Sequence, residues 1–203
     1  MKKFLACLVY GFCSIGFGAP IGDPATPHLI REGFFISPES RIDVRAGYEG
    51  DFVADARMEQ YAESTGRVDC YSQETNAGKA TLNFVDRLDL YGILGSSRTC
   101  ADWRFTINGD THRAQIETLY NFLWGIGARG ILYESGCATF GVGSRYEQAH
   151  YDNMWLTIDG LVQHVAGTFL HWRSFQIDAD VAYQIDIFSP YIGIKYSYVR
   201  AKI

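Results

Sequence analysis

Apolar and polar residues alternate with a period of two along much of the chain. The clearest examples are residues 41–52, 121–129, 139–147, 175–185 and 191–198. In the first of these, Ile42 and Val44 alternate with Asp43 and Arg45. Successive side chains of a strand point to opposite faces, so this pattern predicts long strands with one apolar and one charged face.

Shorter segments between these predict further strands, about eight to ten in all. They lie at 56–63, 80–84, 88–94 and 103–107, while the nearly uniformly apolar segment 161–170 is ambiguous. More polar intervals predict loops at 64–76, 96–101, 108–116 and 149–160. The connections are too short for crossover helices, so we expect one all-β, antiparallel, meander-like domain.

Two antiparallel architectures fit this pattern. A soluble barrel or sandwich buries the apolar face, whereas a transmembrane β-barrel turns it toward lipid and encloses the polar face. The longest predicted strands match the roughly 9–11 residues of a tilted membrane crossing better than the roughly 5–6 of soluble strands. Aromatic residues gather near strand ends, which is typical of interfacial girdles. The pattern therefore favours an antiparallel transmembrane β-barrel.

The composition agrees with a folded β protein. Hydrophobic residues make up 47% and charged residues 20% of the 203 positions, which excludes intrinsic disorder. The 13 Tyr, 13 Phe and 21 Gly favour strands and turns over helices. The net charge of −5, with scattered bases, argues against nucleic acid as a partner.

The N-terminus has the features of an export signal. Lys2 and Lys3 precede a mostly apolar run from Phe4 to Phe17, and small residues follow at Gly16 and Gly18. The run is shorter than the roughly 20 residues that a spanning helix needs. We therefore predict a signal peptide at 1–18, with cleavage after Gly18 or alternatively Ala19, and an outer-membrane β-barrel domain at 19–203.

Alternation also predicts which residues occupy each side of a transmembrane barrel. The expected lumen-facing residues are Arg41, Asp43, Arg45, Arg129, Arg145, Glu147, Asp178, Asp180, Asp186 and Lys195. The expected interfacial aromatic residues are Tyr48, Trp124, Trp172 and Tyr191. Acids outnumber bases along the polar faces, which predicts a weak cation preference at most in a conducting pore.

Three cysteines remain beyond the predicted signal, namely Cys70, Cys100 and Cys137. An odd count in an oxidising compartment means that at least one thiol is free, reactive or joined to another chain. All three are candidates for disulfides, and the sequence leaves their pairing open.

Catalytic chemistry finds little support. The five histidines show no metal-ligand spacing, and neither a nucleophile elbow nor a phosphate loop is present. Asp178 and Asp180 share a strand face at a distance of about 7 Å, which could suit paired carboxylates, but alternating lumen charge explains them more simply. We therefore expect no enzyme activity, metal or cofactor.

Several blocks of sequence resemble the chlamydial major outer membrane protein family, in the same order. They are residues 19–27, 46–53, 75–95, 124–141 and 188–197. The most specific runs from Trp124-Gly-Ile-Gly-Ala-Arg-Gly130 to Glu134-Ser-Gly-Cys-Ala-Thr-Phe-Gly141. The resemblance implies an outer-membrane porin for small solutes, part of a disulfide-linked envelope.

The chain also departs from that family. Cys137 matches a family cysteine, whereas Ser135 stands where the family usually has another. Surface loops are shorter here, and the last residues, Arg200 to Ile203, lack the family's further strands and terminal aromatic residue. We therefore expect a short family member.

Three functions remain open. The first is porin-like diffusion, with conductance that is small unless chains combine, because about eight strands enclose only enough space for side chains. The second is a self-plugged structural or adhesive barrel without channel activity. The third is an exported soluble β-barrel that binds an apolar ligand. The partners expected for the membrane forms are outer-membrane lipid, further copies of the chain or disulfide-linked envelope proteins.

Overall fold

A computed structural model describes residues 12–14, 41–60, 66–107, 109–165, 167–185 and 190–202. Its regular structure is a single sheet of ten strands, paired antiparallel throughout. The strands are β1 (Phe12–Ser14), β2 (Ile42–Gln60), β3 (Gly66–Phe84), β4 (Leu88–Ile107), β5 (Asp110–Thr118), β6 (Asn121–Ser135), β7 (Ala138–Ile158), β8 (Leu161–Val162), β9 (Phe169–Tyr183) and β10 (Tyr191–Lys202). The predicted all-β antiparallel fold is confirmed.

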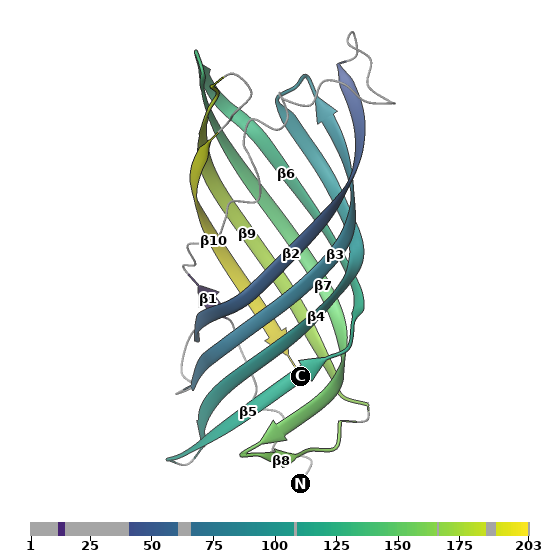
Figure 1. Ribbon diagram of the computed structural model, residues 1–203, viewed down its shortest axis with the longest axis vertical. Coiled ribbons are helices and arrows are strands. Elements are labelled where there is room, and N and C mark those ends of the chain that lie inside the picture. Colours follow the sequence, from purple (N-terminus) through teal and green to yellow (C-terminus); the bar gives the residue numbers. More distant parts are fainter. Residues whose placement is uncertain are drawn as a thin grey trace.

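The strand pairings run in a ring, and Figure 1 shows the long tilted strands wrapped around a common axis. β5 and β6 together take one place in this ring. β4 pairs with β6 up to Ser97 and with β5 from Cys100 onward, and β7 pairs with the same two strands on the other side. β8 pairs only with residues 157–158 of β7 and is not part of the ring.

The ring closes through the shortest strand. Six successive antiparallel pairings connect β2 to β10 through β3, β4, β6, β7 and β9, so β2 and β10 run in the same direction. β1 lies antiparallel between them, with Phe12 opposite Gln60 of β2 and Val199 of β10. β1 falls within the predicted signal peptide, most of which lies outside the described residues.

The four predicted loops are wrong, because each interval contains strand. Residues 66–76 belong to β3, 96–101 to β4, 110–116 to β5 and 149–158 to β7. The predicted separate strand at 56–63 is also wrong, since β2 continues to Gln60. The cause is an interior that buries polar side chains such as Thr75 and Ser97. Outward residues in the same segments, such as Glu74 and Arg98, are polar too, so the apolar alternation by which strands are recognised is lost.

Most of the outer surface of the ring is apolar, apart from ion pairs on β3, β4 and β5. Ile192 is 79%, Tyr48 73% and Phe52 67% exposed, and similar side chains project from the other long strands. Charged side chains such as Asp89 and Arg145 are instead buried inside. This arrangement is the one that a barrel in lipid requires, and a soluble barrel would reverse it. Within the described ranges, no helix is long and apolar enough to cross a membrane.

The interior has two parts. Toward the turn at residues 85–87 the inward side chains are mostly charged, whereas toward β5 and β8 they form an apolar cluster. Its members include Val68, Tyr71, Trp103, Ile116, Leu123, Tyr151, Leu156, Leu170, Trp172 and Val199.

Removal of residues 1–18 should open the seam between β2 and β10. β1 supplies the strand-to-strand partners of residues 59–60 and 197–199 on that side. Hydrogen exchange measured by mass spectrometry on micelle-folded protein should therefore be faster at 197–199 in a chain that starts at residue 19. Exchange in the matched segment 174–177, which lies between β7 and β10, should not change. Equal protection at 197–199 in both chains would show that β1 does not hold the seam.

Candidate functional site

The charged interior brings together most of the residues predicted to face the lumen. Those placed inside are Asp43, Arg45, Arg129, Arg145, Glu147, Asp178, Asp180 and Lys195. Arg41 precedes β2 and is exposed at the end of the barrel, while Asp186 lies outside the described residues. The strands position these side chains by alternation, and the register decides which of them meet.

One cluster centres on Asp89, which is 1% exposed. Its carboxylate accepts hydrogen bonds from Asn83 Nδ2 at 2.7 Å and Arg129 Nη2 at 3.3 Å. Arg45 Nη1 lies 3.7 Å away, so two guanidinium groups from β2 and β6 flank one carboxylate on β4. A buried carboxylate needs such partners because desolvation would otherwise make its charged form unstable.

A second cluster centres on Arg145 of β7. Its guanidinium donates to the carboxylates of Glu49 and Glu147, which come from β2 and β7. Glu49 also lies 3.4 Å from Lys79 Nζ, and Lys79 stands 4.0 Å above the ring of Tyr91. These contacts connect opposite walls of the ring, since β2 and β7 are not neighbours in the sheet. The cluster therefore crosses the interior.

Asp178 and Asp180 lie inward on β9, each 2% exposed. Cross-strand glycines leave room for them, with Gly143 opposite Asp178 and Gly193 opposite Asp180. A Cβ atom on Gly143 would lie only 2.4 Å from an oxygen of Asp178. Lys195 is the β10 neighbour of Asp178 and supplies positive charge beside it. Glycine at these positions makes space for inward charge.

The apolar part of the interior is filled by large side chains. Trp172, Tyr151, Ile93 and Leu123 are each 2% exposed or less. The rings of Tyr151 and Trp172 meet edge to face, with centroids 6.5 Å apart. Tyr151 Oη also lies 2.5 Å from Ser97 Oγ, and this hydrogen bond connects the apolar side chains to β4. Solute movement through the interior would have to displace or bypass these groups.

The four predicted interfacial aromatic residues occupy different places. Tyr48 is exposed on the outer face, and Trp124 lies on the outer face with its ring 5.8 Å from that of Tyr146. The assignment of Trp172 is corrected, because its side chain is 2% exposed and lies inside. Position 172 has the same parity as the inward Ser174 and Asp178, so strand alternation turns it away from lipid. Tyr191 is exposed at the start of β10, on the same strand face as Lys195.

Among the described residues, no disulfide joins Cys70, Cys100 and Cys137, the three cysteines predicted as candidates for such bonds. Cys70 and Cys100 lie on adjacent strands, opposite Asp102 and Ser72 respectively, so they are diagonal neighbours. Diagonal positions are separated by about 7–8 Å, which exceeds the Cα separation of most disulfides. Cys137 is exposed in the turn between β6 and β7, where another chain can reach it.

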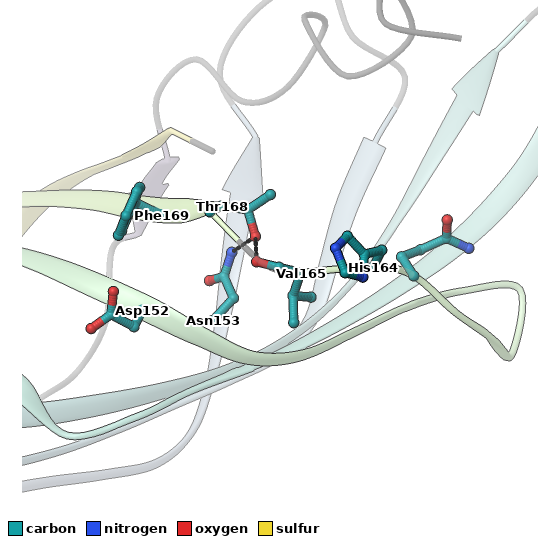
Figure 2. Close-up of a pocket in the computed structure, with 8 residues that line it drawn as sticks. Asp152, Asn153, His164, Val165, Thr168 and Phe169 are labelled. Atoms are coloured by element: carbon teal, nitrogen blue, oxygen red, sulfur yellow. Dashed lines mark hydrogen bonds between the residues drawn. The ribbon is translucent and has the colours of Figure 1, made fainter.

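A hollow of about 440 Å³ lies beside the loop that precedes β9 (Figure 2). Asn153 Nδ2 donates to Thr168 Oγ1 at 3.0 Å, and Thr168 Oγ1 donates to the Val165 carbonyl oxygen at 2.7 Å. These bonds connect Asn153 to the loop, although Asn153 Oδ1 is buried without a hydrogen-bond partner among the described residues. His164 is exposed in the same loop. Among the described residues, no group of three or more His, Cys, Asp or Glu is placed to hold a metal ion.

Sequence reasoning missed several members of the interior clusters. Asp89, Asn83, Lys79 and Tyr91 were not among the expected lumen residues, although Asp89 is central to one cluster. The alternation of Leu88 and Leu90 with Asp89 and Tyr91 could have placed the last two residues in the interior. In the structure the two leucines are exposed, and Asp89 and Tyr91 are buried.

An antiparallel ring with an apolar exterior and paired charges inside defines the class of transmembrane β-barrels. Comparison with known proteins shows which family the chain is similar to. A family model described as "Chlamydia major outer membrane protein" matches residues 104–162 of the chain. The resemblance to chlamydial major outer membrane proteins, first visible in the motifs, extends over nearly the whole chain and is confirmed.

The relatives are named major outer membrane porins. One from Chlamydia pneumoniae is 25% identical over 290 aligned positions, which cover 97% of this chain and 75% of the relative. A porin from Chlamydia muridarum is 25% identical, and the alignment covers 97% of this chain and 73% of that porin. The porin of Chlamydia trachomatis serovar F is 24% identical, with 97% of this chain and 74% of the porin aligned. An alignment of 290 positions exceeds the 203 residues of this chain, so the relative carries insertions within the matched region. No solved structure matches.

Replacement of Arg145 by Met should destabilise the barrel strongly. The change leaves Glu49 and Glu147 without their shared partner, and breaking a buried ion pair costs about 3–5 kcal/mol. Urea unfolding in micelles, followed by tryptophan fluorescence, measures the loss. Arg87→Met is the control, because Arg87 is 59% exposed in its contact with Glu134 and should change stability by less than about 1 kcal/mol. Equal effects of the two variants would contradict the cluster.

Gly143→Ala should also lower stability, by about 1–3 kcal/mol, because its new methyl group would collide with the Asp178 carboxylate. The same urea titration measures it. Gly92→Ala is the matched control, since a Cβ atom there meets nothing within 4 Å. If Gly143→Ala were as stable as Gly92→Ala, Asp178 would not occupy the space that Gly143 leaves.

Proposed function

We propose that this protein is an outer-membrane barrel of the porin type, which lets small solutes cross through its charged interior. The observation that carries the proposal is the apolar outer surface around buried, paired charges. The relatives named as porins support both the outer-membrane location and the channel role. A channel of this kind needs no catalytic group, so the role is non-enzymatic.

The interior would select solutes by size and charge. The clusters around Asp89 and Arg145 bridge the walls and narrow the path, and the apolar layer around Trp172 and Tyr151 narrows it further. A ring with eight strand positions has an interior that side chains fill, whereas open porins have about 16–18 strands. We therefore expect small unit conductance, and larger conductance only if copies of the chain combine.

Export through the segment at 1–18 is a further part of this proposal, and cleavage after it would remove β1 from the seam between β2 and β10. Disulfide links through the cysteines are another part. Cys137 is the best candidate for a link to another envelope protein because it is exposed in a turn. Cys70 and Cys100 lie on the outer wall, where a bond to another chain would have to form within or beside the membrane.

A second candidate function is a plugged structural barrel without channel activity. The fully buried Trp172, Tyr151 and Leu123 favour it, because they fill the end of the interior near β5. The soluble ligand-binding barrel has less support, since it would leave Ile192 and Ile194, 79% and 75% exposed, in water.

Planar-bilayer recordings on the folded protein separate these functions. Porin function predicts discrete, stable steps with a weak cation preference in a salt gradient. Asp178→Asn together with Asp180→Asn should shift the reversal potential toward anions, because the two carboxylates line the interior. Asp69→Asn with Asp102→Asn is the matched control, since these acids pair with arginines on the outer wall. Silence from protein shown by circular dichroism to be folded would favour the structural barrel.

A further inference from the structure

The outer faces of β7, β9 and β10 carry a group of basic side chains at one end of the apolar surface. They are His150, His171, Arg173, Arg200 and Lys202, all exposed, and we call them the basic patch. It lies at the end of β10 where the chain terminus is marked in Figure 1. The arrangement follows from strand register and could not be read from the spacing of these residues along the chain.

Two rows of paired residues form the patch. Gln148, Arg173 and Arg200 occupy one row across the three strands, and His150, His171 and Lys202 occupy the next. The rings of His150 and His171 meet edge to face with centroids 4.5 Å apart, and Gln148 Nε2 lies 3.0 Å from His150 Nε2. The charged members of the patch, Arg173, Arg200 and Lys202, therefore lie within two adjacent cross-strand rows.

Aromatic side chains mark the boundary between the patch and the apolar surface. The row directly above Arg173 consists of Tyr146, Phe175 and Tyr198, and the next includes Ile177 and Tyr196. Aromatic rings at such a boundary are typical of the level at which lipid headgroups meet the hydrocarbon. The patch thus lies at headgroup depth if the barrel spans a membrane.

The described arginines on the outer wall of β3, β4 and β5 have acidic partners. Arg98 is 2.9 Å from Glu74, and Arg104 and Arg113 pair closely with Asp69 and Asp102. Within the part of the chain that the structure describes, no ion pair joins Arg173 or Lys202 to a carboxylate. Asp152, which is one row below His150, instead accepts a hydrogen bond from Asn121 Nδ2 at 2.7 Å. The positive charges of Arg173 and Lys202 are therefore not balanced by a carboxylate in the way that those of Arg98, Arg104 and Arg113 are.

We propose that the basic patch binds the phosphate of an anionic phospholipid headgroup, with the acyl chains along the apolar wall above it. Charge complementarity and the aromatic boundary select this occupant, since arginine forms bidentate bonds with phosphate and lysine provides a point charge. The inference rests on the proposed membrane barrel. It adds a lipid site to the outer wall that the channel function does not require.

Lipid competition on the full folded protein tests this site. The protein is placed in bilayers of equal phosphatidylcholine and phosphatidylglycerol with identical chains, and the lipids that remain bound after gentle release are counted by native mass spectrometry. Wild-type protein should retain phosphatidylglycerol in preference to phosphatidylcholine. Arg173→Gln with Lys202→Gln should reduce that preference by roughly ten-fold or more, because each basic residue near an anionic surface contributes to attraction.

The control variant is Arg67→Gln with Arg87→Gln, which removes the same charge from exposed side chains that pair with Asp69 and Glu134. It should keep the wild-type preference. An equal loss in both variants would attribute the preference to net charge and overturn the site. Abolition of the preference by millimolar inorganic phosphate would indicate a site for free phosphate and would also overturn it.

Insertion into pure phosphatidylcholine vesicles separates this inference from the proposed function. A chain that gains β-structure by circular dichroism but gains no protease protection there would count against the membrane barrel itself. A protected, folded chain without phosphatidylglycerol preference would overturn only the lipid site.

Discussion

The structure depends on backbone hydrogen bonding that continues around the sheet. In lipid each unpaired N–H or C=O group costs several kcal/mol, so a sheet must close on itself to remove its edges. Here β2 and β10 point in the same direction, and the antiparallel β1 provides the connection between them. The short β1 therefore makes this seam the weakest part of the wall. A chain without it would present two edges to lipid, to each other or to another copy.

Closure also determines where charge can lie. Once the outer face is apolar, alternating positions must project inward, and their charges have to pair across a narrow interior. Asp89 and Arg145 achieve this with partners from several strands, while Gly143 leaves the space that a neighbouring carboxylate fills. The same clusters that stabilise the wall also obstruct the path through it. Stability and conductance are therefore opposed in a barrel of this size.

Two sides of the outer wall differ as well. Arginines on β4 and β5 pair with acids on neighbouring strands, whereas the basic patch on β7, β9 and β10 follows directly below a row of aromatic side chains. Such an asymmetry gives the barrel distinct sides around its circumference. Lipid and protein partners would then meet different chemistry according to the side that they approach.

The sequence alone determined that the protein is built from long antiparallel strands, and that each has an apolar and a charged face. It does so because side-chain direction follows position within a strand, as Ile42 to Arg45 illustrate. Only the tertiary structure decided which charges meet, since Arg145 and Glu49 lie 96 positions apart and are joined across the interior. It also decided that polar segments such as 66–76 are strands and that Trp172 lies inside. Register and closure depend on hydrogen bonds between distant segments, and local alternation carries no information about those pairings.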